Sequence, residues 1–324
     1  MLELVNLSNI PHEVKTLLGG EKAALEDFLA RHHLDGLELF LYGPRDESFF
    51  PAALVHGVHL RFWPAWVSFW RQDVAKMARD YGDDAAVKKT FGSLRVEDWV
   101  EVWRANIQSA VAAGAGYLVL HVSEAPMSEL SARPFTTITD EEVIDATLEL
   151  VAALAKEIPA DCRLLFENLW WPGLTFRRPD LAERLVTRSK HPNCGFMLDT
   201  GHLMCTDLDL TNEQEGADFV VAAYEALGSL KEKVYGLHLH QSLSGAYVRA
   251  MREAHQGERW PAEIGEIMDY ITRVDWHRPF TTAAVRRIVD AVRPDYLVHE
   301  FLPASFHEWE EKVRTQRQAL GWEQ

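Results

Sequence analysis

The sequence predicts a single (β/α)8 TIM barrel that occupies residues 1–324, and three observations lead to this prediction. Eight short apolar runs recur along the chain, segments with helical periodicity separate them, and no linker or internal repeat divides the sequence. Strands that alternate with helices form right-handed βαβ units and hence a parallel sheet. Eight such units in 324 residues fit a closed barrel better than an open, doubly wound sheet.

The predicted strands are short runs rich in Val, Leu, Phe and Tyr, which are typical of a parallel sheet buried on both faces. In chain order they are expected at residues 2–7, 37–42, 55–62, 117–122, 163–168, 195–200, 234–241 and 296–301.

Helical periodicity is clearest from residue 96, where apolar side chains recur at spacings of three and four residues as far as Val111. Other helices are expected at 21–31, 141–156, 179–188, 213–227 and 281–292. Two connections are too long for plain loops. Residues 64–96 are predicted to contain one or two extra helices, and residues 242–276 form a long excursion. We therefore expect extended loops after strands 3 and 7 that carry function or form a lid.

Composition excludes several classes of protein. The chain has 33 Lys plus Arg against 49 Asp plus Glu, a net charge of −16, which argues against tight nonspecific binding to nucleic acid. No apolar run approaches the roughly 20 residues that span a bilayer. The first residues lack a basic targeting segment, and the three cysteines form no CxxC pair. We expect a cytoplasmic protein with no membrane partner.

Nearly every predicted strand ends in a side chain that can bind a metal. In a barrel these strand ends open on one face, so the side chains should converge there. Burying a lone carboxylate costs several kcal/mol unless it is paired or bound to a cation. The pattern therefore predicts a divalent metal, with candidates at Glu38, His59, His121, Glu167, Asp199, His202, His238, His240 and Glu300.

A structural role is the alternative for several of these residues. His59 or His121, taken singly, could be an ordinary hydrogen-bonded core residue, and Glu38 could be a buried salt-bridge partner. His238 lies on the same strand face as His240 but deeper in the barrel, so we expect a structural role for it. The joint placement of these residues, rather than any single one, favours a site.

Four segments together resemble the xylose isomerase-like TIM-barrel superfamily, which contains sugar and sugar-phosphate isomerases and epimerases as well as endonuclease IV. These are Phe-Glu-Asn at 166–168, Leu-Asp-Thr-Gly-His at 198–202, Leu-His-Leu-His at 237–240 and Val-His-Glu at 298–300. The resemblance implies one metal held by Glu167, Asp199, His240 and Glu300, with His202 contacting the substrate.

Three carboxylates and one imidazole suit Mn²⁺ or Mg²⁺ and tolerate Co²⁺ or Zn²⁺. Such an ion would bind the carbonyl and hydroxyl of a sugar and stabilise an enediolate. Glu167 and Glu300 would then move protons on opposite sides of the substrate. The resemblance thus implies a metal-dependent isomerase or epimerase for a small carbohydrate, phosphorylated or not, and leaves open whether the chain forms a homo-oligomer.

Endonuclease IV is the alternative within the same superfamily, and it implies three Zn²⁺ ions. The additional ligands would be His59, His121, His202, Asp275 and His277, which in an isomerase would bind substrate. Against it, the spacing from His240 to Asp275 is longer than in the endonuclease pattern, and dense Lys/Arg clusters are lacking. The indoles of Trp63, Trp66, Trp170 and Trp171 are expected to wall the pocket and stack on a sugar. The sequence therefore favours the isomerase, and nucleic acid is not an expected partner.

Overall fold

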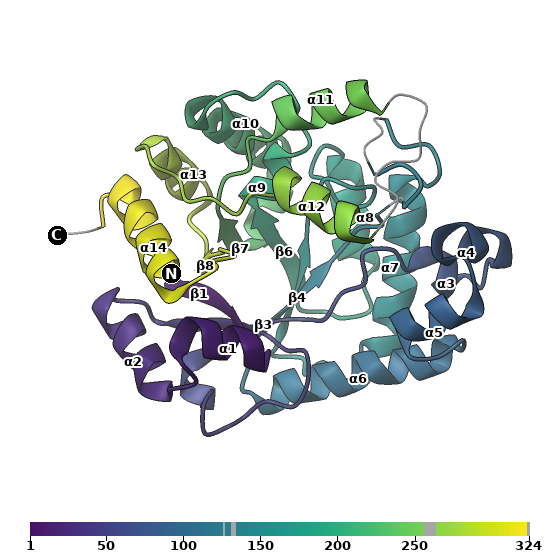
Figure 1. Ribbon diagram of the computed structural model, residues 1–324, viewed down its shortest axis with the longest axis horizontal. Helices are drawn as coiled ribbons and strands as arrows, with labels where there is room; N and C mark the ends of the chain where they lie inside the picture. Colours follow the sequence, from purple (N-terminus) through teal and green to yellow (C-terminus); the bar gives the residue numbers. More distant parts are fainter. Residues whose placement is uncertain (126, 131–133, 256–263, 323–324) are drawn as a thin grey trace.

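The computed structural model describes residues 1–125, 127–130, 134–255 and 264–322. Eight parallel strands close into a barrel in sequence order, and β1 pairs with β8 to complete it. The predicted fold is confirmed (Figure 1). The strands are β1 (Leu2–Ser8), β2 (Gly36–Phe40), β3 (Val55–His59), β4 (Tyr117–His121), β5 (Arg163–Glu167), β6 (Cys194–Asp199), β7 (Val234–Leu239) and β8 (Tyr296–His299).

Several strands end earlier than the apolar runs predict. β3 ends at His59 and β7 at Leu239, whereas the runs extend to residues 62 and 241. The residues beyond these ends enter the loops at the carboxyl end of the barrel, where the candidate ligands begin. Inside the barrel a small apolar cluster fills the other end, and its buried members are Leu4, Tyr117, Val119, Leu165, Met197 and Val298.

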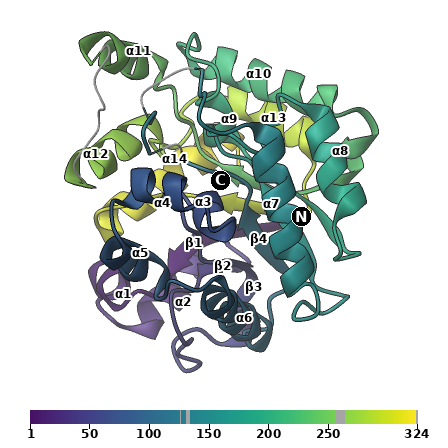
Figure 2. The same ribbon diagram turned by 90° about the vertical axis from the view of Figure 1, so that its right-hand side faces the viewer.

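An outer layer of helices covers the barrel, as Figures 1 and 2 show. Trp99, Trp103 and Ile107 are buried on the inner side of α6, in agreement with the predicted stripe. Among the described residues, none of the helices is both long and apolar enough to cross a membrane. The helices of this layer are α1 (Pro11–Leu18), α2 (Lys22–Arg31), α6 (Val96–Ala112), α7 (Asp140–Leu154), α8 (Pro179–Arg188), α9 (Thr200–Met204), α10 (Glu213–Ala226), α13 (Ala284–Val292) and α14 (Phe306–Leu320).

The long connections contain further helices. The segment after β3 forms α3 (Val67–Trp70), α4 (Val74–Tyr81) and α5 (Asp84–Phe91), which is three helices where the sequence predicted one or two. After β7 the chain forms α11 (Gly245–Ala254) and α12 (Ile264–Val274), which lie side by side in Figures 1 and 2. Residues 256–263 of this excursion lie outside the described residues. A second apolar cluster joins α11 and α12 to the loop after β5 through Val248, Tyr270 and Trp170.

Glu124 ties together the loops after β3 and β4. Its carboxylate Oε2 accepts hydrogen bonds from the backbone N–H groups of Trp66, at 2.7 Å, and Val67, at 3.0 Å. The side chain is buried, and burial raises its pKa to about 8 from an ordinary value of 4.5. The carboxyl group of Glu124 is therefore neutral in the folded protein at pH 7. It joins the loop after β3 to the loop after β4.

We expect Glu124→Gln to raise the melting temperature at pH 8.5 and to leave it nearly unchanged at pH 5. Between pH 4.5 and 8 the folded state binds a proton at this carboxyl that the unfolded state has lost, so stability falls as pH rises through that window. The difference at pH 8.5 is about 5 kcal/mol, because one pKa unit corresponds to about 1.4 kcal/mol. Thermal unfolding at both pH values tests this, with exposed Glu97→Gln as the control.

Candidate metal centre

Ten side chains with metal-binding atoms gather where the strands end, and they form three groups of the described residues. Within each group the ligand atoms lie within 4.8 Å of one another. The first group is His59, His121 and Glu167; the second is Glu167, Asp199, His238 and Glu300; the third is His202, His240, Asp275 and His277. The four ligands and five additional ligands that the family resemblance implies are all among these ten, and the tenth is His238.

Glu167 belongs to the first group and also to the second. Its Oε2 lies 3.1 Å from Nε2 of His59 and 3.2 Å from Nε2 of His121. Its Oε1 lies 3.2 Å from Nδ1 of His238 and 3.3 Å from Nδ1 of His202. The carboxylate is completely buried, with imidazole nitrogens facing both oxygens. It is therefore placed as a bridge between neighbouring ligand groups.

Hydrogen bonds to the backbone orient three of the histidines. Nδ1 of His59 lies 2.9 Å from the carbonyl oxygen of Leu60. Nδ1 of His202 lies 3.0 Å from the carbonyl oxygen of Asn168, and Nδ1 of His277 lies 3.2 Å from that of Glu300. Only a protonated Nδ1 can donate to a carbonyl oxygen, so each Nε2 is the nitrogen left for another partner. Fixing the tautomer in this way is typical of metal-binding histidines.

His238 is oriented through Nε2 instead of Nδ1, and its partner is a carboxylate. Its Nε2 lies 2.9 Å from Oε1 of Glu38, whose Oε2 accepts a hydrogen bond from the hydroxyl of Tyr117. Nδ1 of His238 is then directed at the second group, 3.2 Å from Oε2 of Glu300. Glu38 is 1% exposed and therefore acts as the buried partner that the sequence left as one of its two alternatives.

The histidine that gathers with the three carboxylates is His238, to which the sequence gave only a structural role. His240, the predicted ligand, lies in the third group, although its Nε2 is also 2.9 Å from Oδ2 of Asp199 and 3.7 Å from Oε2 of Glu300. Both side chains point into the barrel because alternate strand residues share a face. Sequence alternation cannot tell which of the two lies at the depth of the carboxylates.

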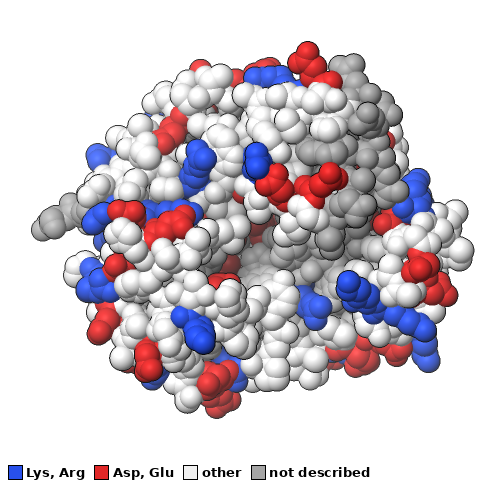
Figure 3. Space-filling view, viewed as in Figure 1, with Lys and Arg blue, Asp and Glu red and all other residues white. Residues whose placement is uncertain are grey.

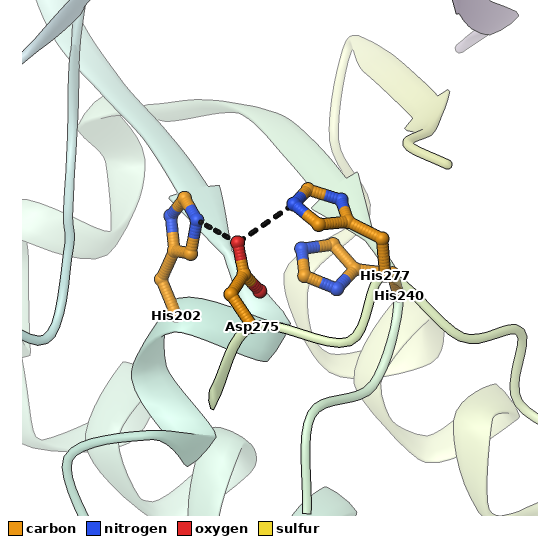
Figure 4. A group of neighbouring side chains, drawn as sticks. All are labelled: His202, His240, Asp275 and His277. Atoms are coloured by element: carbon orange, nitrogen blue, oxygen red, sulfur yellow. Dashed lines mark hydrogen bonds and ion pairs between the residues drawn. The ribbon is translucent and has the colours of Figure 1, made fainter. Parts of the chain in front are cut away.

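The third group joins a residue of α9, the residue that follows β7 and two residues that follow α12 (Figure 4). Nε2 of His202 lies 3.1 Å, and Nε2 of His277 2.7 Å, from the same oxygen of Asp275. The ring of His240 stacks on that of His277, with centroids 4.1 Å apart. The hydroxyl of Ser242 donates to the other Asp275 oxygen at 3.0 Å. Two imidazoles thus converge on one oxygen.

The Asp-Thr-Gly-His segment positions both Asp199 and His202. Asp199 caps α9, because its Oδ1 accepts the backbone N–H of His202 at 2.6 Å. The amide of Asn168 makes two hydrogen bonds with the backbone of Asp199, at 2.8 and 3.0 Å. The hydroxyl of Thr200 donates to the carbonyl oxygen of His240 at 2.6 Å. Asn168 and Thr200 are supporting residues that the sequence analysis did not assign.

Gly201 is required by the closeness of His240. A Cβ atom on Gly201 would lie 2.0 Å from Cε1 of the His240 ring. We expect Gly201→Ala to displace this ring, to destabilise the fold by about 1–3 kcal/mol and to lower the metal content. Gly265→Ala in α12 is the matched control, since nothing lies within 4 Å of its Cβ. Equal metal content in both variants would contradict the role given to His240.

Charge in the cluster is unbalanced without a cation. Four carboxylates and six imidazoles carry −4 if the histidines are neutral. Burial alone would raise the pKa of Glu167, but His121 and His238 outweigh it and hold the pKa well below its usual range. Burial lowers the pKa of His202, but Asp199 and Asp275 hold it well above its ordinary value. Cations would replace the protons that the histidines otherwise need.

The donor set fits divalent metals. Oε2 of Glu300 and Nδ1 of His240 are buried with no hydrogen-bond partner. Nε2 of His59 and Nε2 of His121 face each other at 3.1 Å, although Nδ1 of His59 is the nitrogen that donates to a carbonyl. Two imidazole nitrogens and a carboxylate oxygen thus meet at one point, which suits a cation. Mixed imidazole and carboxylate ligands are typical of Zn²⁺, Mn²⁺ and Fe²⁺ sites.

Residues 27–276 match the family model described as a xylose isomerase-like TIM barrel. The chain belongs to this family. The resemblance noted in the sequence is therefore confirmed. No curated protein matches the sequence.

Solved structures with the same fold include family members of different activity. Endonuclease IV from Thermus thermophilus has a TM-score of 0.51 and 17% identity, and the match covers 99% of each chain. A D-tagatose 3-epimerase-like protein has a TM-score of 0.50 and 15% identity, covering 99% of this chain and 97% of its own. A D-psicose 3-epimerase has a TM-score of 0.51 and 11% identity, covering 99% and 98%. At such identities these likenesses establish the fold alone.

The four tryptophans that the sequence placed in the pocket wall occupy different surroundings in this family member. Trp63 and Trp66 pack against Trp99 of α6 in the main core, and each donates its indole N–H to a backbone carbonyl. Trp170 lies beside the third group, with its ring centroid 5.2 Å from that of His202, and it stacks near Trp171. Trp63, Trp66 and Trp171 also line one small cavity that His121 lines with them.

Charge on the surface is mixed. Figure 3 shows Lys and Arg side chains scattered among acidic ones over the visible face, which is hollowed near its centre. Where basic residues lie near this end, many are paired, as Arg71 is with Glu149 and Arg249 with Asp209. At the lower right of the view, several Lys and Arg side chains lie next to one another in a short run.

Proposed function

We propose that this chain is a hydrolase that cleaves phosphate esters of a small substrate with a centre of up to three divalent metal ions. The observation that carries the proposal is the bridging position of Glu167, whose two oxygens face imidazoles of different ligand groups. Shared carboxylates between close metal sites are suited to phosphoryl chemistry, in which neighbouring cations stabilise the attacking and leaving oxygens.

The same observation weakens the isomerase hypothesis that the sequence favoured. Carboxylate-mediated proton transfer needs Glu167 and Glu300 free on opposite sides of a sugar carbon. Glu167 is fully buried, and both of its oxygens are engaged by histidines, so it has no free oxygen for a substrate proton. Glu300, at 12% exposed, is the more accessible of the two carboxylates.

The three ligand groups would each hold a cation, with Zn²⁺ the best match to the six imidazoles. When bound, such cations supply Lewis-acid activation of a phosphoryl oxygen and of water. The protein orients the ligands through Glu38 and the backbone carbonyls that fix the histidine tautomers. Trp170 lies beside His202, with ring centroids 5.2 Å apart.

Glu300 is the residue we assign to proton transfer. Its side chain is 12% exposed, against 0% for Glu167 and Asp199, and its Oε2 lies 3.2 Å from Nδ1 of His238. A carboxylate oxygen of this kind can accept a proton from water as it attacks phosphorus. Burial alone would raise the pKa of Glu300, but His238 and His277 outweigh it and hold the pKa well below its usual range, so the carboxylate is ionised at neutral pH.

A small substrate fits the surface better than duplex DNA. The net charge of −16 repels a polyanion. A single phosphate ester needs only the cationic centre itself. We therefore place DNA behind small phosphodiesters and phosphomonoesters as a substrate.

Hydrolysis of bis(p-nitrophenyl) phosphate and p-nitrophenyl phosphate by zinc-loaded protein tests the proposal. We expect turnover that is lost on chelation, restored by Zn²⁺ and reduced in Glu300→Gln, with Glu97→Gln on the exposed side of α6 as the matched control. The proposal would be contradicted if neither ester were hydrolysed. It would also be contradicted if Glu300→Gln and Glu97→Gln hydrolysed the esters at equal rates.

An isomerase or epimerase of a small carbohydrate is the second candidate, and Trp170 beside His202 favours it because an indole can stack on a sugar ring. Exchange of solvent deuterium into D-fructose by the metal-loaded protein distinguishes it. Deuterium exchange without ester hydrolysis would replace our proposal with this one.

A further inference from the structure

Two phenylalanine side chains border the first metal group at the mouth of the barrel, where the carboxyl ends of the strands open. Phe40 is the last residue of β2, and Phe62 follows the end of β3 by three residues. The ring centroid of Phe62 lies 4.3 Å from that of His121, and the centroid of Phe40 lies 5.1 Å from that of His59. The two phenyl rings are 5.9 Å apart. Each ring therefore packs against a candidate metal ligand.

The apolar core does not account for these two phenylalanines. Each is only half-buried, so part of each ring remains open. Other half-buried aromatic side chains, such as Phe49, Trp70 and Phe219, pack against the main core. Within the described part of the chain, Phe40 and Phe62 pack against none of the three apolar clusters. A ligand that covers the two rings would remove their apolar surface from water, which is favourable.

A small cavity beside Phe62 cannot hold such a ligand. Phe62 lines it together with His121 and Trp63. Its volume is about 20 Å³, which is room for one water molecule. A ligand ring would therefore have to approach from the mouth, where Phe40 lies.

The rim next to Phe40 is rich in π-electrons and carries a cation. Tyr42 is 48% exposed, and its ring centroid lies 4.7 Å from that of Phe40. The guanidinium carbon of Arg61 lies 5.8 Å from the centre of the Tyr42 ring and 4.7 Å from that of Trp63. Aromatic rings and a guanidinium group both interact favourably with a further aromatic ring. This rim therefore favours a planar aromatic ligand over an alkyl chain.

The position of the rings indicates which part of a substrate they contact. Phe40 and Phe62 pack directly on His59 and His121, whose Nε2 atoms face Oε2 of Glu167 in the first metal group. A phosphate held by cations at this centre would place the group bonded to its ester oxygen next to the two phenyl rings. The rings thus select the group directly attached to the phosphate.

We propose that the substrate is an aryl phosphate, whose aromatic ring packs against Phe40 and Phe62 while its phosphate lies at the metal centre. This inference rests on the hydrolase function proposed above and names its substrate class. Phe40 and Phe62 are then the residues that determine specificity for the aromatic group.

Calorimetric titration of the zinc-loaded full chain with phenylphosphonate and with methylphosphonate tests this proposal. Both compounds carry a phosphonate group and have no ester bond to hydrolyse, so they differ in the organic group. We expect phenylphosphonate to bind at least about tenfold more tightly, because its ring buries apolar area and contacts two phenyl rings. Glucose 6-phosphate should bind more weakly than phenylphosphonate.

Phe40→Leu and Phe62→Leu keep an apolar side chain but remove the aromatic ring. Each should weaken the binding of phenylphosphonate about fivefold and leave the zinc content and the binding of methylphosphonate unchanged. Phe219→Leu is the matched control, since Phe219 is a half-buried phenylalanine of α10 that packs against the main core. This control should bind both phosphonates like the parent.

Equal affinity for the two phosphonates would overturn the aryl specificity, while hydrolysis of the nitrophenyl esters would still support the hydrolase. The aryl specificity would also be overturned if the preference for phenylphosphonate survived both substitutions, or if glucose 6-phosphate bound more tightly. If neither phosphonate bound, the aryl site and the phosphate-binding centre would both be contradicted. The comparison on the parent protein decides the question even if a substituted chain loses its metal.

Discussion

Replacing Glu167 with glutamine is expected to lower phosphate-ester hydrolysis at least about 1000-fold, which corresponds to roughly 4 kcal/mol of transition-state stabilisation. Glutamine keeps the volume but loses the negative charge that the first and second ligand groups share. A neutral amide cannot bridge two cations, and its N–H₂ group would face the imidazoles of two groups. Both metal content and rate should therefore fall together.

The measurement is the initial rate with bis(p-nitrophenyl) phosphate alongside elemental analysis of the same sample. Glu149→Gln is the matched control, because that glutamate lies on the surface and pairs with Arg71. If Glu167→Gln keeps both the full metal content and the parent rate, the bridge is not part of the centre.

Removal of metal is expected to have the largest effect on stability. Each cation that binds only the folded chain, at a free concentration 100 times its dissociation constant, contributes about 2.7 kcal/mol. Three sites would together contribute roughly 8 kcal/mol, which for a chain of this size is a fall of about 15 °C in melting temperature. Scanning calorimetry of chelated and zinc-loaded protein measures the difference.

The stabilisation of the fold by bound metal should decrease as pH falls. Metal binding requires deprotonated imidazoles, and the pKa of His202 and of His238 is held well above its ordinary value in the metal-free fold. The difference between loaded and chelated protein should therefore increase with pH and shrink as pH falls toward 5. A melting temperature that is unaffected by chelation at pH 7.5 would rule out occupied metal sites.

The barrel was predictable from the sequence because its signals are local. Apolar runs and helical stripes recur along the chain, and all eight predicted strands are present, with ends that differ by a few residues. The three helices between β3 and α6 were less predictable. α3 is only four residues long and carries no cap from a side chain, so the sequence holds little signal for it.

The identities of the candidate metal ligands were predictable from the sequence. How these residues divide into three groups was predictable only in part. Residues at strand ends converge by topology, and that placed Glu167, Asp199 and Glu300 together. The choice between His238 and His240 depends on depth along one strand face, which two-residue alternation does not encode. The position of Glu38 behind His238 is the signal that could have decided it, and it links strands far apart in the sequence.

Tertiary packing also determines where the four predicted pocket tryptophans lie. Trp63 and Trp66 follow β3 much as Trp170 follows β5, so the sequence treats them alike. In the fold, Trp99 of α6 offers the first pair an apolar partner, and nearby backbone carbonyls accept their N–H groups. The pair after β5 has His202 as a neighbour instead.

The number of metal ions bound to each chain tests the central claim most directly. Protein purified without chelator, loaded with Zn²⁺ and freed of excess metal would be measured by elemental analysis against an accurate protein concentration. The three ligand groups and the bridging Glu167 predict three equivalents per chain, falling to no more than two in His277→Ala. One equivalent per chain, unchanged in His277→Ala, would contradict the multinuclear centre.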